Sequence, residues 1–182
     1  GYVIESDRNL GVVRNHRTNT GMDLIWEPRK VVAQNSEGKA FWSLDLNTDL
    51  RPQVWEVDLY RNRKYQAVVF AEKEVYVIDV LGRSVKGFPK RWSRGFSAVS
   101  VMDYDRNRQY RFLMAAPNGE LFNFRREGER TPGWSFKPQQ GRYITSLAHL
   151  RVGDKDYIFA GQDDNTVRFL TRSGEDRFDA AL

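Results

Sequence analysis

Two aspartates and an asparagine on alternate positions, Asp103, Asp105 and Asn107, are the residues best spaced for metal chemistry. Side-chain oxygens in such an alternating pattern can converge on a hard cation such as Ca²⁺. Arg108, however, stands where a calcium loop needs its glycine, and no acidic residue follows in the place of the closing bidentate ligand. We therefore expect an Asp/Asn-rich hairpin turn here, with a cation site as the weaker alternative and no metal assigned.

The chain has two histidines, His16 and His149, and neither has a second histidine or a pair of carboxylates near it in sequence. A structural role is favoured for both over zinc binding or acid–base chemistry. No serine-nucleophile motif and no phosphate-cradling glycine loop stands out. Cysteine is absent, which excludes disulfides and cysteine-based zinc sites. We expect no catalytic residues and no cofactor.

Basic residues interleaved with aromatic ones form the best candidate for a binding surface. They occur in three segments that connect successive sequence repeats: Arg51, Lys90, Arg91, Trp92, Arg94, Phe96, Arg142 and Tyr143. Charge and ring stacking together could hold an anionic polysaccharide, a peptide carboxylate or a nucleic-acid backbone. The alternative is that the aromatic rings pack between repeats while the arginines are merely solvated. A second basic group, expected at the opposite end of the repeats, lacks aromatic residues: Arg61, Arg63, Lys64, Arg106, Arg108 and Lys155.

An internal repeat must position these groups. Gly82, Gly128 and Gly174 follow apolar runs in matching contexts at a spacing of 46 residues, and Gly38 lies 44 residues before Gly82. Tyrosines mark a second repeated position, each at the start of a strongly apolar run: Tyr65, Tyr110 and Tyr157. The apolar runs alternate with period two and are joined by Gly- and Asn-containing turns, which is typical of antiparallel strands. A period in this range is typical of a propeller blade.

The sequence thus predicts an all-β chain, a β-propeller-like array of about four four-stranded antiparallel blades with a repeat of 44–47 residues. We expect one domain or fragment over residues 1–182, with blades at about 11–46, 54–90, 97–138 and 144–182. Residues 2–5 could supply a closing strand for the last blade. Three arrangements stay open: a small closed ring, a homodimer through open blade edges, or a partial propeller cut from a larger one.

Composition sets broad limits on the partners. The chain of 182 residues carries a net charge of +5, with 21 Arg against 8 Lys, which mildly favours an anionic partner. No charge run resembles a nucleic-acid-binding tail, and no apolar run is long enough for a membrane span. Because the sequence opens on Gly1, we expect it to be a piece of a longer protein.

Several phrases resemble the C-terminal, propeller-like region of a family of large envelope proteins from Bacteroidetes-type bacteria. The resemblance covers about residues 13–177, and its most characteristic segments are 13–16, 80–89, 103–111 and 133–136. It implies a WD40- or quinoprotein-like propeller at the cell envelope, outside the cytoplasm, with no assigned activity. Gly38 and Trp42 are similar to the Gly-x-x-x-Trp ending of quinoprotein repeats. The vicinal cysteines of quinone-dependent alcohol dehydrogenases are absent, so the resemblance does not imply a quinone.

These observations favour a non-catalytic propeller that binds a protein or an anionic glycan at the bacterial cell envelope. A quinoprotein-like or lyase-like enzyme domain is the alternative from another class, and it would need convergent acid–base residues. Nucleic-acid binding is a second alternative, supported only by the basic charge and the arginine content.

Overall fold

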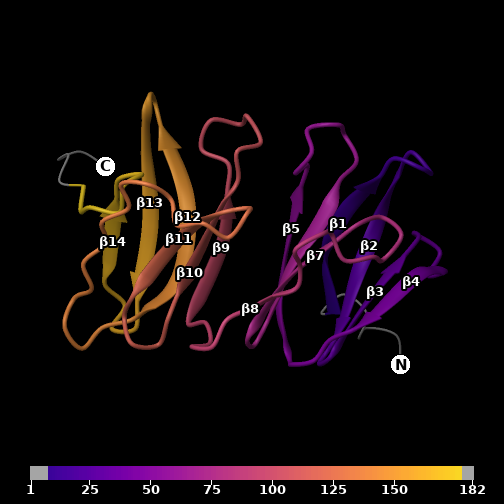
Figure 1. Cartoon of the computed structure of the whole chain (residues 1–182), viewed down its shortest axis with the longest axis horizontal. Coiled ribbons are helices and arrows are strands. Elements are labelled where there is room, and N and C mark those ends of the chain that lie inside the picture. The colour runs from indigo at the N-terminus through magenta and orange to yellow at the C-terminus, as the bar shows by residue number, and fades with distance from the viewer. Residues whose placement is uncertain (1–7, 178–182) are drawn as a thin grey trace. The chain divides into compact units, whose positions relative to one another are not determined.

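The computed structural model describes residues 8–177, and within that range the chain is built from β-strands in four antiparallel sheets, without an α-helix (Figure 1). This confirms the all-β prediction. The strands are rich in β-branched and aromatic residues, which suit the pleated surface of a sheet. The chain divides into two compact units between Ser93 and Arg94. Unit 1 contains sheets 1 and 2, and unit 2 contains sheets 3 and 4.

Each sheet of unit 1 has four strands in sequence order. Sheet 1 consists of β1 (Asn9–Asn15), β2 (Thr20–Glu27), β3 (Lys30–Gln34) and β4 (Ala40–Asp45). Sheet 2 consists of β5 (Leu50–Val57), β6 (Gln66–Ala71), β7 (Glu74–Ile78) and the short β8 (Lys90–Arg91).

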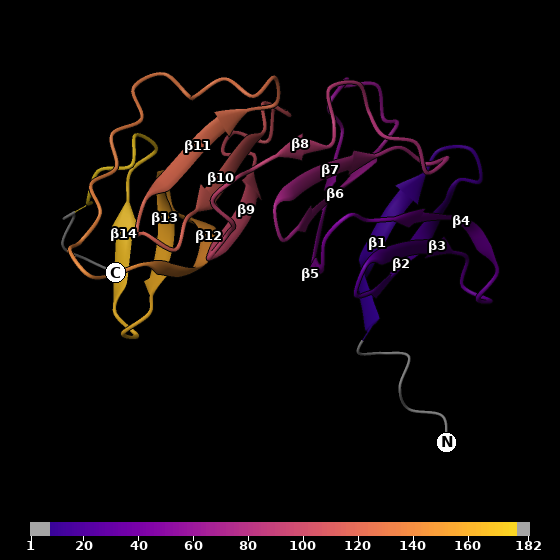
Figure 2. The same ribbon diagram turned by 60° about the horizontal axis from the view of Figure 1, so that its bottom comes forward.

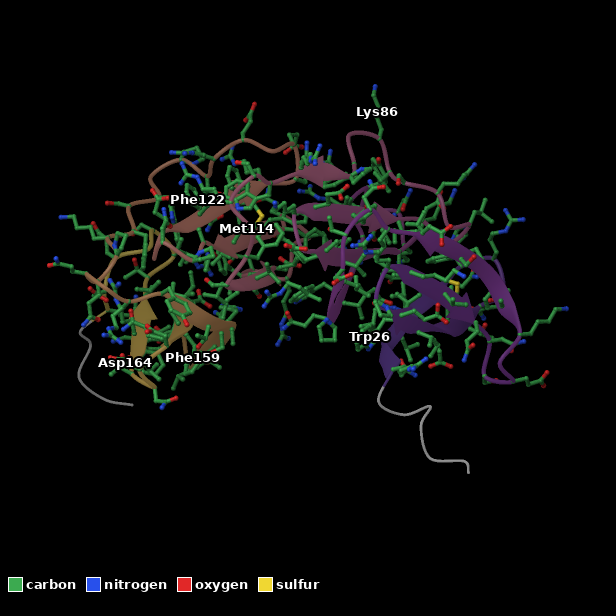
Figure 3. All side chains as sticks on the ribbon, turned by 90° about the horizontal axis from the view of Figure 1, so that it is seen from below. Trp26, Lys86, Met114, Phe122, Phe159 and Asp164 are labelled. Atoms are coloured by element: carbon green, nitrogen blue, oxygen red, sulfur yellow. The ribbon has the colours of Figure 1, made fainter. Side chains whose placement is uncertain are left out.

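Each sheet of unit 2 has three strands, and Figure 2 shows them in a second view. Sheet 3 consists of β9 (Ala98–Met102), β10 (Arg111–Ala115) and β11 (Leu121–Arg125). Sheet 4 consists of β12 (Ile144–Val152), β13 (Lys155–Gln162) and β14 (Val167–Leu170). In sheet 3, Met114 and Phe122 are partners on neighbouring strands, as Figure 3 illustrates.

The repeated glycines occupy corresponding turns in all four sheets. Each glycine N–H donates to the carbonyl three residues earlier, at 2.9–3.0 Å, and each has a positive φ between 81° and 91°. The residue that accepts this bond also donates its own N–H to the residue after the glycine, at 2.8–2.9 Å. Glycine suits the position because a side chain is strained at such φ values. The predicted 46-residue repeat is thereby confirmed at the level of backbone hydrogen bonds.

Sheet 3 lacks the fourth strand of the predicted four-stranded pattern. Residues 133–136 do not extend sheet 3, whose outer edge has only an isolated bridge between Phe124 and Arg130. Instead the Ser135 N–H donates at 2.7 Å to the carbonyl of Ser173, in the turn after β14, so this segment bonds to the next repeat. The prediction of four strands for the blade at 97–138 is wrong for that reason. The proposed closing strand at 2–5 lies outside the described residues.

A tryptophan joins the two sheets in each unit. In unit 1 the Trp42 side chain lies against Gly82, where an added Cβ would come within 2.7 Å of the indole ring. In unit 2 Trp134 lies against Gly174 in the same way, at 3.0 Å. The Trp42 indole N–H donates to the Val80 carbonyl at 3.1 Å. Gly82 and Gly174 thus each leave room for an indole ring from the preceding repeat.

The apolar core of each unit is continuous across its two sheets. In unit 1 the buried cluster includes Val13 from sheet 1 together with Val69 and Ile78 from sheet 2. In unit 2 a similar cluster includes Leu113 of sheet 3 and Ile158 of sheet 4. Burying a side chain of this size contributes about 1.5–3 kcal/mol relative to exposure. The sheets of each unit are therefore held together face to face.

Candidate functional site

The residues of the predicted cationic–aromatic surface fall into two groups, one on each unit. On unit 1, Arg51 follows the first residue of β5, while Lys90 and Arg91 form β8 and Trp92 comes directly after it. The strand register brings these positions to the same end of sheet 2, because Leu50 is paired with Ala71 and Arg91 is paired with Glu74 across the short β6–β7 turn. All four residues thus lie at one end of sheet 2, and their role in binding stays a prediction.

Within this unit 1 group the side chains differ in exposure. Arg91 is exposed, whereas Arg51 and Trp92 are half-buried. Burial lowers the pKa of the Arg51 guanidinium because the charged form loses hydration. The Lys90 ammonium lies 5.2 Å from the centre of the Phe88 ring, a cation–π contact. The end of sheet 2 thus combines an exposed cation with partly buried aromatic and basic side chains.

On unit 2, Arg94 and Arg142 are both matched by carboxylates. Arg94 forms an ion pair with Glu120. Arg142 lies 3.2 Å from the Asp163 carboxylate and 3.8 Å from that of Asp164. These two arginines help to fix turns of sheets 3 and 4.

Of the two remaining predicted residues, Phe96 is half-buried, and Tyr143 is 40% exposed. Its N–H donates to the Asp163 carboxylate at 3.0 Å. Its carbonyl accepts the Asp163 N–H, also at 3.0 Å. Its backbone is thus fixed to the β13–β14 turn while its ring meets solvent.

The three residues of the calcium-like pattern serve a turn and an ion pair. The Asp103 carboxylate accepts the N–H groups of Asn107 and Arg108, both at 3.0 Å. The Asn107 side chain accepts the Gln109 N–H at 3.1 Å, and Asp105 forms an ion pair with Arg172. Among residues 8–177 there is no group of three potential metal-binding His, Asp or Glu side chains.

The equivalent loop of sheet 2 has the same geometry. The Asp58 carboxylate accepts the N–H groups of Asn62 and Arg63, at 3.0 and 2.8 Å. Arg61 and Arg106 share a φ of 53°, and Arg63 and Arg108 have φ values of 61° and 65°. The two loops are therefore copies of one turn, and Asp58 and Asp103 organise its backbone.

His149 belongs to an ion-pair network that joins sheets 3 and 4. Its Nε2 lies 2.9 Å from Asp156, whose side chain is only 12% exposed. Arg172 pairs with both Asp156 and Asp105, and its guanidinium lies 5.0 Å from the Tyr104 ring centre. Desolvation raises the pKa of Asp156, but hydrogen bonds from His149 and Arg172 outweigh it and leave this pKa below its usual value.

Comparison with solved structures places this arrangement of sheets among known folds. The chain is similar to BBS1N, crystallised in complex with ARL6DN, at 15% identity and a TM-score of 0.66; the match covers 94% of this chain and 51% of the other. It is also similar to the Pan2 WD40 domain of Neurospora crassa (15% identity, TM-score 0.58, 92% of this chain and 48% of the other). BamB from Moraxella catarrhalis is a further match (15% identity, TM-score 0.55, 93% and 52%).

The four sheets are β-propeller blades. The predicted fold class is thereby confirmed, and the chain spans about half the length of the structures it matches. No family model matches the sequence, and no curated protein matches it. The bacterial envelope family that the sequence resembles is therefore not shown by these comparisons. Among residues 8–177 no helix is long and apolar enough to cross a membrane.

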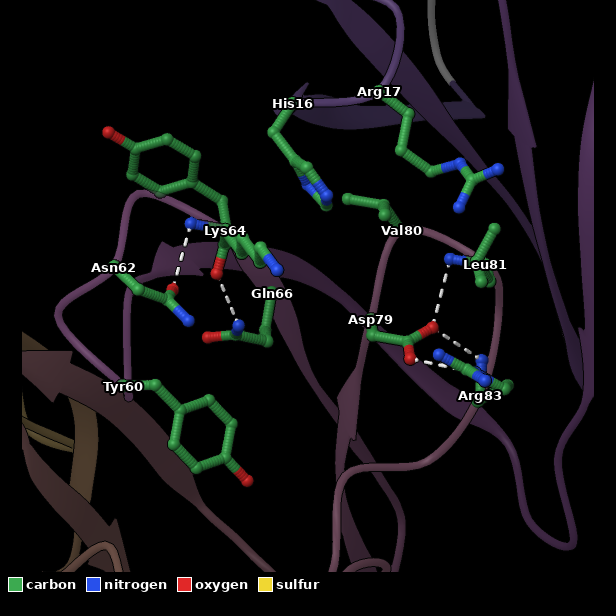
Figure 4. A pocket seen from close by; sticks show the side chains of 11 residues that line it. His16, Arg17, Tyr60, Asn62, Lys64, Gln66, Asp79, Val80, Leu81 and Arg83 are labelled. Carbon is green, nitrogen blue, oxygen red and sulfur yellow. Dashed lines mark hydrogen bonds and ion pairs between the residues drawn. The ribbon is translucent and has the colours of Figure 1, made fainter.

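Sequence reasoning missed a pocket in unit 1, between the β1–β2 turn of sheet 1 and two turns of sheet 2 (Figure 4). Its volume is about 270 Å³. Tyr60 and Leu81, which are 53% and 43% exposed, supply apolar surface to its lining. The description of this end of the repeats as lacking aromatic residues is therefore wrong for unit 1. The signal available in the sequence was Tyr60 itself, which stands in the same loop as the basic residues Arg61, Arg63 and Lys64.

Proposed function

We propose that this chain is a non-catalytic propeller module that binds an acidic segment of a partner protein at the cell envelope, outside the cytoplasm. The observation that carries the proposal is the end of sheet 2, where exposed Arg91 on β8 and half-buried Trp92 directly after it share one end of the sheet with half-buried Arg51 of β5. An arginine can bind a carboxylate bidentately, and a neighbouring indole adds contact area at small entropic cost.

A protein partner is favoured over a glycan by the fold. BBS1N, to which this chain is similar over most of its length, has been crystallised in complex with another protein, ARL6DN. Propellers present rigidly held loops, which suits recognition of a partner surface. The envelope location rests on the sequence resemblance alone, and fractionation of the native cells with an antibody against the protein tests it.

The binding test compares three anionic polymers on the immobilised protein. Poly-L-glutamate stands for an acidic protein segment, polygalacturonate for an anionic glycan, and duplex DNA for nucleic acid. We expect poly-L-glutamate to bind most tightly, and the double variant Arg91→Ala/Trp92→Ala to weaken this binding about tenfold or more. Arg125→Ala, which removes an exposed arginine from the other unit, is the matched control and should bind like the wild type.

Two kinds of result would contradict the proposal. Tighter binding of polygalacturonate would make the module a glycan binder, and tightest binding of DNA with a steep salt dependence would indicate a nucleic-acid binder. Equal losses in the double variant and in Arg125→Ala would show that only the net charge matters.

A further inference from the structure

The pocket in unit 1 has an excess of positive charge that its surroundings do not balance. Its charged lining residues are three cations and one carboxylate, Arg17, Lys64, Arg83 and Asp79, which together carry a net charge of +2. His16 also lines it. Among residues 8–177, the Arg17 guanidinium, the Lys64 ammonium and the His16 ring have no hydrogen-bond or ion-pair partner. In unit 2, by contrast, Arg94, Arg142 and Arg172 each have a carboxylate partner.

The acidic groups nearby are already engaged. The Asp79 carboxylate lies 3.0 Å from Arg83 Nε and also accepts the N–H groups of Leu81 and Arg83. Asp58 is buried and accepts two backbone N–H groups of the β5–β6 loop. Arg83 and Asp79 therefore compensate each other, and the unbalanced charge lies on Arg17 and Lys64.

The groups that line the pocket are carried by well-fixed turns. Lys64 donates its backbone N–H to Asn62 Oδ1 at 3.0 Å, and its carbonyl accepts a bond from the buried Gln66 side chain. Arg17 donates its N–H to Asn15 Oδ1 at 2.9 Å. Figure 4 shows His16 and Arg17 on one side of the pocket, Lys64 on another, and Val80 and Leu81 beside them. The cations are thus presented around a common space.

The walls are partly apolar. Tyr60, Tyr65, Val80 and Leu81 all contribute to the lining. The Tyr65 ring contacts Arg14, whose guanidinium lies 3.8 Å from the ring centre in a cation–π contact. Arg14 is itself fixed by an ion pair with Glu56. Small-molecule sites typically combine such apolar walls with a few convergent polar groups. The volume of about 270 Å³ is suited to a small molecule rather than to a polymer.

We propose that this pocket binds a small organic dianion with an apolar substituent, such as an aromatic phosphate monoester or an aromatic dicarboxylate. Two negative charges match the net charge of the lining, and the substituent covers Tyr60 and Leu81. The site is independent of the surface proposed above, since it lies at the opposite end of sheet 2: the β5–β6 loop and the residues after β7 adjoin it, whereas Arg91 pairs beside the β6–β7 turn.

Calorimetric titration of the whole chain tests the proposal. We expect saturable binding of phenyl phosphate or phthalate. Phenyl phosphate carries both negative charges on one group and phthalate carries them on two carboxylates, so the tighter binder shows which arrangement the pocket prefers. Benzoate, with one charge, and inorganic phosphate, without a ring, should each bind at least several-fold more weakly. Because the cations are exposed, the affinity should also fall as salt is added.

Variants locate the binding. Arg17→Met and Lys64→Met should each weaken binding of the tighter probe about tenfold, since each removes one charged partner. Lys86→Met removes an exposed lysine from the same unit, in the loop labelled in Figure 3, and should leave the affinity unchanged. All three are exposed positions, and equal thermal midpoints confirm that the variants are folded.

The proposal is overturned if neither dianion binds saturably in the millimolar range. It is also overturned if Lys86→Met weakens binding as much as Lys64→Met does, because the anion would then respond to net charge alone. If the wild type binds poly-L-glutamate but neither dianion, this pocket is rejected as a binding site and the proposed function stands. If it binds a dianion but not poly-L-glutamate, the proposed function is rejected and the pocket stands.

Discussion

At the joint between sheets 3 and 4, Arg172 lies between two carboxylates, whereas the corresponding residue at the joint between sheets 1 and 2 is Val80. The position of Asp156 in the first joint is occupied by Lys64 in the second. Both correspondences are fixed by the repeat, since Lys64 and Asp156 each precede a repeated tyrosine and Val80 and Arg172 each stand two residues before a repeated glycine.

The consequence is a closed joint in unit 2 and an open one in unit 1. Asp156, with a side chain 12% exposed, links His149 and Arg172 in the closed joint. In the open joint the lysine has no acidic partner among residues 8–177, and a pocket remains. Both units therefore share the same structural frame, which consists of the turn glycine and the tryptophan packed against it. The charged residues beside this frame differ between the units.

The largest expected effect concerns the frame that the two joints share. Trp42→Ala and Trp134→Ala should each lower the free energy of unfolding by about 2–4 kcal/mol, because each removes a large ring from between two sheets. Phe41→Ala, next to Trp42 on β4 but 41% exposed, is the control and should cost less than about 1 kcal/mol. Urea denaturation measures all three. An equal loss of stability for Phe41→Ala and Trp42→Ala would show that the tryptophan between the sheets has no special stabilising role.

A second prediction separates backbone strain from crowding at the repeated turn. Gly38→Ala and Gly82→Ala place a side chain at nearly the same φ, 83° and 81°, which costs about 1–2 kcal/mol. Only at Gly82 would the new Cβ also meet an indole ring, at 2.7 Å. Gly82→Ala should therefore destabilise the protein by at least about 1 kcal/mol more than Gly38→Ala. Equal denaturation midpoints would show that the ring moves aside freely.

A third prediction concerns the charges that differ between the joints. Arg172→Met should lower the free energy of unfolding by about 1 kcal/mol, because it removes the guanidinium that pairs with the Asp156 carboxylate, whose side chain is only 12% exposed. Lys64→Met should change it by less than about 0.5 kcal/mol, since this lysine has no acidic partner in the described chain. Thermal and urea denaturation of both variants and the wild type measure the two effects. A larger loss for Arg172→Met than for Lys64→Met is the result expected of a closed joint in unit 2 and an open one in unit 1.

The smallest expected effect is a dependence on pH. The pKa of Asp156 is lower in the folded protein than in the unfolded chain, so the unfolded state takes up a proton first as the pH falls. The stabilisation of the folded state by ionised Asp156 is therefore present above about pH 4, and it disappears as the pH falls through the lowered pKa of this carboxyl. The difference in unfolding free energy between wild type and Asp156→Asn, below about 1 kcal/mol, should shrink between about pH 6 and about pH 3. A difference that stays constant would exclude ionisation of Asp156 as its source.

The strands, the turns and the grouping of Arg51 with Arg91 and Trp92 could be predicted from the sequence, because each depends on local patterns or on the repeat. The missing strand at 133–136 could not, because Ser135 bonds to a neighbouring repeat rather than to its own sheet. The unit 2 arginines were predicted as ligand-binding residues and the structure pairs them with acids that are distant in sequence, such as Asp163 for Arg142.

The pocket escaped prediction for the same kind of reason. Its cations come from two different sheets, and no single segment of sequence contains both Arg17 and Lys64. The one available signal was the mismatch between repeats, in which a lysine takes the place of Asp156. A difference in charge between equivalent positions of two repeats is therefore the sequence signal that indicates an open joint.

The most direct test of this contrast is an amide ¹⁵N–¹H spectrum of the whole chain recorded during titration with phenyl phosphate. The open joint predicts saturable shifts at the turns that carry Arg17, Lys64 and Leu81, with the amides around Asp156 and Arg172 unmoved. Shifts that cluster instead at Arg172, or that appear equally at both joints, would contradict the account.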